Sequence, residues 1–229
     1  MEVLAIIPAR GGSKGIPMKN IKPLAGHPLI YYSVMAGKNS KYVTRTVLST
    51  ENEKIKQVAL KECNCEVIDR PEELAQDETK TIPVLIQVCE YLKEKENYIP
   101  DVVVLLQPTT PTRDAKQLDE AFEIFLNNDC DSVFAVQNLG TTHSKWRQNP
   151  HTKEFECLFD YRNRPRRQDE HLHYPMFTET GSIYIIKRDV MYEVNDFIGK
   201  KPLVYLSEYN DIDTEKDFDD VSKIIEGNN

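Results

Sequence analysis

The chain has 229 residues, of which 40% are apolar, and its formal net charge is -8 at pH 7. This length and composition suffice for one substantial hydrophobic core, so we expect a single domain over residues 1–229. The acidic balance argues against a nucleic-acid or anionic-membrane surface, and any basic stretch is therefore expected to serve a small anionic ligand.

The sequence also bears on location and redox state. No apolar run approaches the ~20 residues of a membrane-spanning helix. The first residues, MEVLAIIPAR, lack a cationic leader and a cleavage site, so we expect a cytoplasmic protein. The five cysteines form neither a C-x-x-C pair nor an even framework, which favours reduced thiols over disulfides or a metal site.

The first motif is a buried strand that leads into a basic, glycine-rich loop. Residues 3–7 are apolar and β-branched, which is typical of a strand covered on both faces. The loop ARGGSKGIPMKN at residues 9–20 contains three cations (Arg10, Lys14 and Lys19), three glycines and no acid. Glycines leave backbone N–H groups accessible, so the loop suits a polyphosphate. Its spacing fits neither the P-loop nor the dinucleotide fingerprint, and a solvated turn remains the alternative.

Helices and strands then alternate, which predicts parallel strands joined by right-handed crossovers. Pro28 is expected in the first turn of a helix. Thr50 and Glu53 match a capping box that begins the next helix. A polar loop, DRPEELAQD at residues 69–77, leads into a third helix. The periodicity predicts helices over residues 28–38 and 81–95, a helix that starts at the Thr50 capping box and runs through Lys61, and strands over residues 44–49 and 66–68.

Residues 101–106, DVVVLL, give the strongest strand pattern in the chain and are expected at the centre of the sheet. QPTTPTR follows at residues 107–113. Open α/β sheets bind ligands beyond the carboxyl ends of their strands, so this loop and the basic loop should face each other across one cleft. A turn shaped by two prolines and anchored by Arg113 is the alternative interpretation.

A helix over residues 115–127 and a strand over residues 132–136 end the regular alternation. Residues 137–177 are rich in His, Asn, Arg and Pro, and we interpret them as an inserted arm of strands and loops, with surface disorder as the alternative. Within it, NRPRRQD at residues 163–169 contains three arginines, whose planar guanidinium groups suit carboxylates and phosphates.

The chain returns to strands over residues 180–186 and 200–206 and then reaches DIDT at residues 211–214. In an extended segment Asp211 and Asp213 point to the same side while Ile212 packs inward. Two carboxylates suit Mg2+, which completes its shell with water and substrate phosphate oxygens. The alternative role is helix capping, because Thr214 and Asp217 resemble a capping box for a final helix. The two roles can coexist.

Taken together, these motifs resemble one family. IIPARGGSKGIPMKNIKPLAGHPLI at residues 6–30 resembles the opening of the acylneuraminate cytidylyltransferases (CMP-sialic acid synthetases). LLQPTTPTR resembles the family's LLQPTSPLR, TGSIYI its NGAIYI, and the RPEELAQD, PRRQ and DIDT strings also match. The resemblance implies an α/β, Rossmann-like nucleotidyltransferase fold with a mostly parallel sheet flanked by helices. It also implies that the arm at residues 137–177 pairs two subunits in a homodimer.

The resemblance assigns roles to individual residues. It implies that Thr79 or Thr81 places a hydroxyl near the ribose and that Gln107 contacts the sugar acid. The residues expected to act in catalysis are Arg10 and Lys19 on the CTP phosphates, with Asp211 and Asp213 as ligands of Mg2+. The residues expected to bind substrate are Ser13, Lys14, Asn20, Thr81, Gln107, Lys145, Arg166 and Gln168.

The implied reaction joins CTP to a nine-carbon α-keto sugar acid of sialic, legionaminic or pseudaminic type and releases pyrophosphate. The sugar's anomeric hydroxyl attacks the α-phosphorus, so no side-chain nucleophile is required, and the sequence shows no convincing Ser-His-Asp or Cys-His set. Charge neutralisation and alignment are what such a reaction needs. A cytidylyltransferase for the eight-carbon 3-deoxy-manno-octulosonate and a noncatalytic nucleotide-binding protein are the alternatives.

Overall fold

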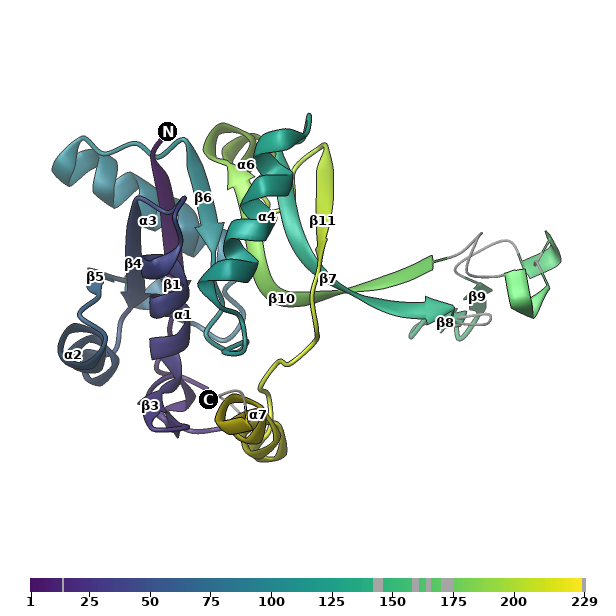
Figure 1. The fold of residues 1–229 in the computed structure, drawn as a ribbon, viewed down its shortest axis with the longest axis horizontal. Coiled ribbons are helices and arrows are strands. Elements are labelled where there is room, and N and C mark those ends of the chain that lie inside the picture. The colour runs from purple at the N-terminus through teal and green to yellow at the C-terminus, as the bar shows by residue number, and fades with distance from the viewer. Residues whose placement is uncertain (14, 142–145, 158–160, 164–165, 170–174, 228–229) are drawn as a thin grey trace.

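The centre of the protein is a seven-stranded sheet with the strand order β11-β7-β10-β6-β1-β4-β5 (Figure 1). The computed structural model describes residues 1–13, 15–141, 146–157, 161–163, 166–169 and 175–227. β10 runs antiparallel to both β6 and β7, and the other neighbouring strands are parallel, so the predicted mostly parallel sheet is confirmed. The strands of this sheet are β1 (Val3–Pro8), β4 (Arg45–Thr50), β5 (Glu66–Asp69), β6 (Val102–Leu105), β7 (Ser132–Thr141), β10 (Pro175–Lys187) and β11 (Pro202–Leu206).

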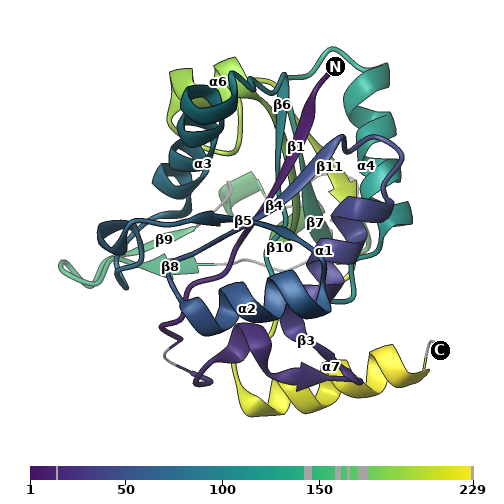
Figure 2. The ribbon, with the colours of Figure 1, turned by 90° about the vertical axis from the view of Figure 1, so that its left-hand side faces the viewer.

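Helices cover both faces of the sheet (Figure 2). α1 (Leu29–Asn39), α2 (Glu53–Glu62) and α4 (Ala115–Asn127) pack on one face, and α3 (Thr81–Glu96) and α6 (Arg188–Val194) on the other. β1 supplies both cores because alternate side chains point to opposite faces: Ala5 and Ile7 face α1 and α4, whereas Leu4 and Ile6 face α3. Within the described residues, no helix is both long and apolar enough to cross a membrane.

A third, smaller core lies beside the sheet and joins distant parts of the chain. It is built from the basic loop, a hairpin of β2 (Pro23–Leu24) and β3 (His27–Pro28), and α7 (Glu215–Gly227). Between the basic loop and this hairpin lies a short 3-10 helix, η1 (Lys19–Ile21). The buried side chains of this core are Ile16, Leu24, Leu29, Ile212, Phe218 and Val221. The basic loop is therefore packed against the segment that contains DIDT.

Residues 137–177, interpreted above as an inserted arm, begin in β7 and end in β10. These two strands continue past the body of the sheet as a ribbon, and the arm projects away from the helices (Figure 1). Its described parts also include a hairpin of β8 (Trp146–Gln148) and β9 (Phe155–Cys157). Two short 3-10 helices of the arm, η3 (Tyr161–Asn163) and η4 (Arg167–Asp169), lie between β9 and β10. Outside the arm, the 3-10 helix η2 (Glu72–Leu74) follows β5.

Local details differ from the sequence prediction at three helices. The predicted capping box at Thr50 is wrong, because Thr50 stays in β4 and pairs with β5. Asn52 caps α2 instead, and its side chain accepts hydrogen bonds from the N–H groups of Lys54 and Ile55 at 3.0 and 3.3 Å. Pro28 precedes α1 as its N-cap rather than lying in its first turn. α6 was not predicted, because its seven residues are too few to establish a helical period.

Candidate active site

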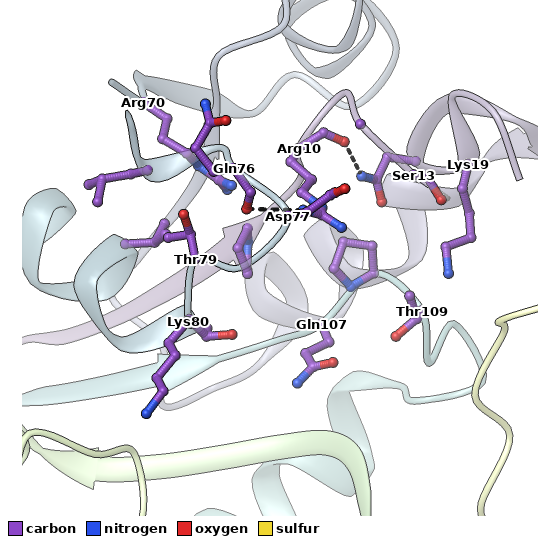
Figure 3. Close-up of a pocket in the computed structure, with 17 residues that line it drawn as sticks. Arg10, Ser13, Lys19, Arg70, Gln76, Asp77, Thr79, Lys80, Gln107 and Thr109 are labelled. Atoms are coloured by element: carbon purple, nitrogen blue, oxygen red, sulfur yellow. Dashed lines mark hydrogen bonds and ion pairs between the residues drawn. The ribbon is translucent and has the colours of Figure 1, made fainter. Parts of the chain in front are cut away.

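A cavity of about 310 Å³ opens at the edge of the sheet where β1, β5 and β6 end (Figure 3). The carboxyl ends of parallel strands meet at one edge, and here each strand contributes the loop that follows it. The three loops are the basic loop after β1, residues 70–81 after β5 and residues 107–109 after β6. The basic loop and the QPTTPTR loop thus line one cavity.

Arg10 extends from the basic loop to the opposite wall of this cavity. Its Nη1 donates a hydrogen bond to the main-chain oxygen of Gln76 at 3.1 Å and lies 3.0 Å from Asp77 Oδ1. Asn20, which is almost fully buried, donates from its side-chain amide to the main-chain oxygen of Arg10 at 2.8 Å. The amide therefore holds the loop in the shape that presents Arg10 to the cavity, and Figure 3 shows this arrangement.

The three glycines of the basic loop serve different purposes. Gly11 donates its N–H to the Glu51 carboxylate at 2.6 Å, and a Cβ there would lie 2.5 Å from the Asn52 amide nitrogen. A Cβ at Gly15 would lie 2.4 Å from the main-chain oxygen of Asp213. Gly12, by contrast, lines the cavity and has open space around it. Two of the glycines are thus required for packing, and only Gly12 matches the expected role of leaving the backbone open to a ligand.

Lys19 connects the cavity to the DIDT segment. Its ammonium donates to the main-chain oxygen of Ile212 at 2.5 Å and lies 3.5 Å from Asp213 Oδ1, and only 11% of its side chain is exposed. Ile212 in turn donates its N–H to the main-chain oxygen of Thr109 at 2.9 Å. DIDT therefore borders the cavity beside the loop after β6, with Ile212 fully buried as predicted.

The two carboxylates of DIDT differ in their surroundings. Asp211 is half-buried, and its Oδ1 is buried without a hydrogen-bond partner. Burial raises the pKa of the Asp211 carboxyl; nearby Asp213 also raises it, while a hydrogen bond from Thr109 and the charge of Lys19 lower it. The Asp213 side chain is 74% exposed. A buried carboxylate oxygen without a partner, beside a second carboxylate and a phosphate-sized cavity, is the donor set that Mg2+ accepts.

Helix capping at α7 is carried out by other residues. The Asp217 carboxylate accepts the N–H of Thr214 at 2.8 Å, and Thr214 Oγ1 accepts the N–H of Asp217 at 3.3 Å. This reciprocal pair is the predicted capping box. The carboxylates of Asp211 and Asp213 are not needed for it, so capping does not compete with a ligand role for them.

The loop after β6 is held by a buried guanidinium. Arg113 is 3% exposed, and its Nη1 donates to the main-chain oxygens of Gln107 and Ser182 at 3.3 and 2.9 Å. Its Nη2 donates to Ser33 Oγ at 2.5 Å. Burial lowers the pKa of Arg113 to about 9, so the group remains charged at neutral pH. The predicted anchoring role of Arg113 is confirmed, and it fixes the backbone from which Gln107 extends.

Gln107 lies against the bulged part of β10. The pairing of β10 with β7 shifts register between Glu179 and Tyr184, and Gly181 in this bulge has a φ of 70°. A Cβ at Gly181 would lie 3.5 Å from Gln107 Oε1. The left-handed backbone favours glycine, whereas 3.5 Å is an ordinary van der Waals contact, and the Gln107 amide is directed at the cavity that it lines.

The wall that follows β5 contains cavity-lining residues that the sequence analysis did not name as site residues. Arg70 is 7% exposed and donates to the main-chain oxygen of Ser49 at 2.7 Å. Burial lowers the pKa of Arg70; Glu51 opposes this shift and Arg10 adds to it. Asp77 and Lys80 line the same wall. The signal was available, because DRPEELAQD follows a parallel strand just as QPTTPTR does.

The predicted site residues fall into four groups, one of which is the pair Asp211 and Asp213 that borders the cavity without lining it. Those that line the cavity are Arg10, Ser13, Lys19, Asn20, Thr81 and Gln107. Arg166 and Gln168 do not line it: both are exposed in the arm, and Arg166 Nε lies 2.7 Å from Asp169 Oδ2. Lys14 and Lys145 lie outside the described residues.

The protein thus combines a three-layer α/β fold with a cationic cavity at the carboxyl edge of its sheet. The comparison of its sequence with family models gives a match to the cytidylyltransferase model over residues 4–225. The chain belongs to the cytidylyltransferase family.

Individual relatives agree with this membership. CMP-N,N'-diacetyllegionaminic acid synthase of Legionella pneumophila is 33% identical over 100% of this chain and 98% of that protein. N-acylneuraminate cytidylyltransferase A of Danio rerio is 32% identical over 95% of this chain, which spans about half (49%) of its length. A solved structure of CMP:2-keto-3-deoxy-manno-octonic acid synthetase shares the fold, with a TM-score of 0.72, 15% identity and full coverage of both chains.

Proposed function

We propose that the protein transfers CMP from CTP to the anomeric hydroxyl of a nine-carbon α-keto sugar acid of sialic, legionaminic or pseudaminic type, with release of pyrophosphate. The observation that carries this proposal is the convergence of cations from two loops, those after β1 and β5, on one cavity next to the paired carboxylates of DIDT. Family membership and the activities named for the relatives from Legionella and Danio support the same reaction class.

The cations of the cavity act by binding and aligning the triphosphate. Arg10 and Lys19 extend from the loop after β1, and Arg70 and Lys80 from the wall after β5. Phosphoryl and nucleotidyl transfer place little demand on covalent catalysis by the protein, because positioning and neutralisation of charge lower the barrier. Fixed cations in a partly enclosed cavity meet both demands.

Gln107 is proposed to orient the sugar acid, because Arg113 fixes its backbone and Gly181 leaves room for its amide. The in-line attack requires the anomeric hydroxyl to lie opposite the leaving pyrophosphate, and a hydrogen bond from an anchored side chain limits the rotation of the sugar. Ser13, Asn20 and Thr81 are proposed as further substrate contacts.

Mg2+ is proposed as the cofactor, held by Asp211 and Asp213. The unpartnered buried oxygen of Asp211 is the feature that supports this site. A bound Mg2+ would supply electrostatic stabilisation of the negative charge on the reacting phosphate. Lys19, which lies 3.5 Å from Asp213 Oδ1, fixes the distance between this segment and the basic loop.

A homodimer is proposed as the active form, with the arm at residues 137–177 as the pairing element. Large apolar side chains on the arm are exposed in the single chain, with Phe155 66% and Trp146 44% exposed. Exposed aromatic side chains on a projecting hairpin are typical of protein interfaces. In such a dimer Arg166 and Gln168, which do not line the cavity of their own chain, are proposed to reach the cavity of the partner.

A cytoplasmic location is proposed from the cysteines. The five cysteines are free, and four of them are buried, so the fold uses no disulfide. Burial raises the pKa of Cys63 to about 11, and those of Cys65 and Cys89 to about 12, which keeps these thiols protonated and unreactive. These properties suit a reducing compartment.

The decisive experiment is a pyrophosphate-release assay with CTP and a panel of N-acetylneuraminic, legionaminic, pseudaminic and 3-deoxy-manno-octulosonic acids. We expect release that requires both CTP and a nine-carbon acid, with CMP-sugar formed in equal amount. Release with the eight-carbon acid alone would replace the proposed substrate class. Binding of CTP with no release for any acid would contradict the proposed enzyme activity.

A further inference from the structure

Asp77 is the one acid among the described residues that line the cavity, where four residues carry positive charge: Arg10, Lys19, Arg70 and Lys80. This carboxylate lies 3.0 Å from Arg10 Nη1, and the contact spans the cavity from the wall after β5 to the basic loop. The cation that extends furthest across the site is therefore already paired with an anion from the protein (Figure 3).

The hydrogen-bond geometry at Arg10 shows what a phosphate would meet. Nη1 carries two hydrogens. One is donated to the main-chain oxygen of Gln76 at 3.1 Å, and Asp77 Oδ1 lies 3.0 Å from the same nitrogen as an ion pair. A phosphate that approaches this nitrogen therefore meets both the carbonyl and the carboxylate. The carboxylate is the one that a phosphate repels, whereas the carbonyl is neutral and fixed by the backbone.

The exposure of Arg10 and Asp77 indicates that a phosphate oxygen can take the place of the Asp77 carboxylate. The Arg10 side chain is 32% exposed and that of Asp77 is 47% exposed, so water and salt screen their attraction. The Gln76 carbonyl can keep Arg10 in place while the carboxylate moves away. Arg10 is thus orientated before the ligand arrives, and only its anionic partner has to change.

We propose that Asp77 is an internal competitor of the substrate phosphates for Arg10, and that it sets the affinity of the cavity for polyphosphate. CTP binding exchanges the Asp77 carboxylate for a phosphate oxygen. When pyrophosphate leaves, the carboxylate returns to Arg10 and prevents the product from binding again. This inference rests on the proposed function in one respect, namely that the polyphosphate is that of CTP.

The test compares Asp77→Asn with Glu78→Gln, a matched control that removes the same charge from the adjacent exposed residue, which does not line the cavity. Calorimetry measures the binding of CTP, inorganic tripolyphosphate and cytidine to each protein without sugar acid. We expect Asp77→Asn to bind CTP and tripolyphosphate about two- to fivefold more tightly, the range of one screened ion pair, and cytidine unchanged. The binding of pyrophosphate, measured in the same way, should tighten by the same factor.

Several outcomes would overturn the proposal. Unchanged or weaker tripolyphosphate binding by Asp77→Asn would mean that Asp77 positions Arg10 rather than competing for it. Equal tightening by Glu78→Gln would indicate a general effect of net charge, and no binding of tripolyphosphate to any of the three proteins would remove the phosphate site itself. Because these assays contain no sugar acid, failure to turn over any sugar acid contradicts the proposed function and leaves the competition between Asp77 and phosphate standing.

Discussion

Lys19 and Asp213 lie 3.5 Å apart, measured from Nζ to Oδ1, although most of the chain lies between them in the sequence. Lys19 also donates to the main-chain oxygen next to Asp213, that of Ile212. One side chain of the basic loop thus fixes the position of the carboxylate segment. Changes on either side of this contact should affect the cavity without affecting the two large cores.

Arg10→Ala should abolish most CTP binding and leave folding intact. The Arg10 side chain is part-exposed and contributes to neither core, so we expect a melting temperature close to that of the wild type. Loss of one charge-assisted contact to phosphate should weaken CTP binding at least tenfold. Calorimetry and thermal unfolding measure the two quantities. Unchanged CTP affinity would show that the basic loop does not hold the phosphates.

Asp211→Asn and Asp213→Asn should separate a metal role from a structural one. Asparagine keeps the size of aspartate but loses its charge, so both variants should fold and bind CTP without metal as the wild type does. We expect turnover to fall by roughly thirty- to thousandfold at saturating Mg2+, the range for loss of one catalytic electrostatic group. Steady-state kinetics measures the effect, and wild-type turnover in both variants would refute the metal site.

The pKa of Asp211 gives this site a second, activity-independent readout. The folded carboxyl holds its proton more tightly than the unfolded one, so the stability that it contributes is present at low pH and falls as pH rises through its raised pKa. Above this raised pKa the ionised group opposes folding. Mg2+ should raise the melting temperature of the wild type at pH 7 and leave Asp211→Asn unchanged. An equal rise in both proteins would place the ion elsewhere.

Gly181→Ala should weaken sugar-acid binding by disturbing Gln107. The left-handed backbone at Gly181 costs about 1–2 kcal/mol with alanine, and relief of this strain should shift the bulge of β10, where the Cβ position of residue 181 lies in ordinary contact with Gln107 Oε1 at 3.5 Å. Gly140→Ala is a matched control, because Gly140 has a φ of 68° but open space around it. Both variants should lose similar stability, and only Gly181→Ala should raise the KM for sugar acid, by about three- to tenfold on the scale of one hydrogen bond. Equal KM values in the two variants would contradict this role of Gln107.

Phe155→Glu should dissociate the proposed dimer. A charge in place of an exposed aromatic anchor typically costs at least tenfold in affinity. Leu60→Glu on α2 is the control, since Leu60 is 44% exposed on the body of the protein rather than on the arm. Light scattering should report a dimer for the wild type and Leu60→Glu and a monomer for Phe155→Glu at the same concentration. A wild-type monomer with full activity would remove the dimer from the mechanism.

The sequence predicted the strands and long helices well because their patterns are local. β1 and β6 are apolar on both faces, and α4 was predicted with the bounds that the structure has, since its apolar residues recur at helical spacing. Asn52 was missed as a helix cap because Thr50 offered an equally good local pattern. Choosing between them required knowing that β4 continues to pair through Thr50.

The candidate site was predictable only where a motif carried it. Arg10, Lys19 and Gln107 belong to strings with recognisable composition, and each lines the cavity. The contact between Arg10 and Asp77 joins loops 67 positions apart and depends on how two strands end at one edge of the sheet. No periodic pattern in the sequence predicts this contact. The position of the Asp77 carboxylate inside the cationic cavity could therefore be seen only in the structure.

The third core has a consequence for synthesis of the chain. Ile16 of the basic loop is buried by Ile212, Phe218 and Val221, which the ribosome adds almost two hundred residues later. A nascent chain can therefore form β1, β4, β5 and β6 while the basic loop still lacks the surface that buries Ile16. The basic loop, although made first, therefore gains its complete packing only after α7 has emerged.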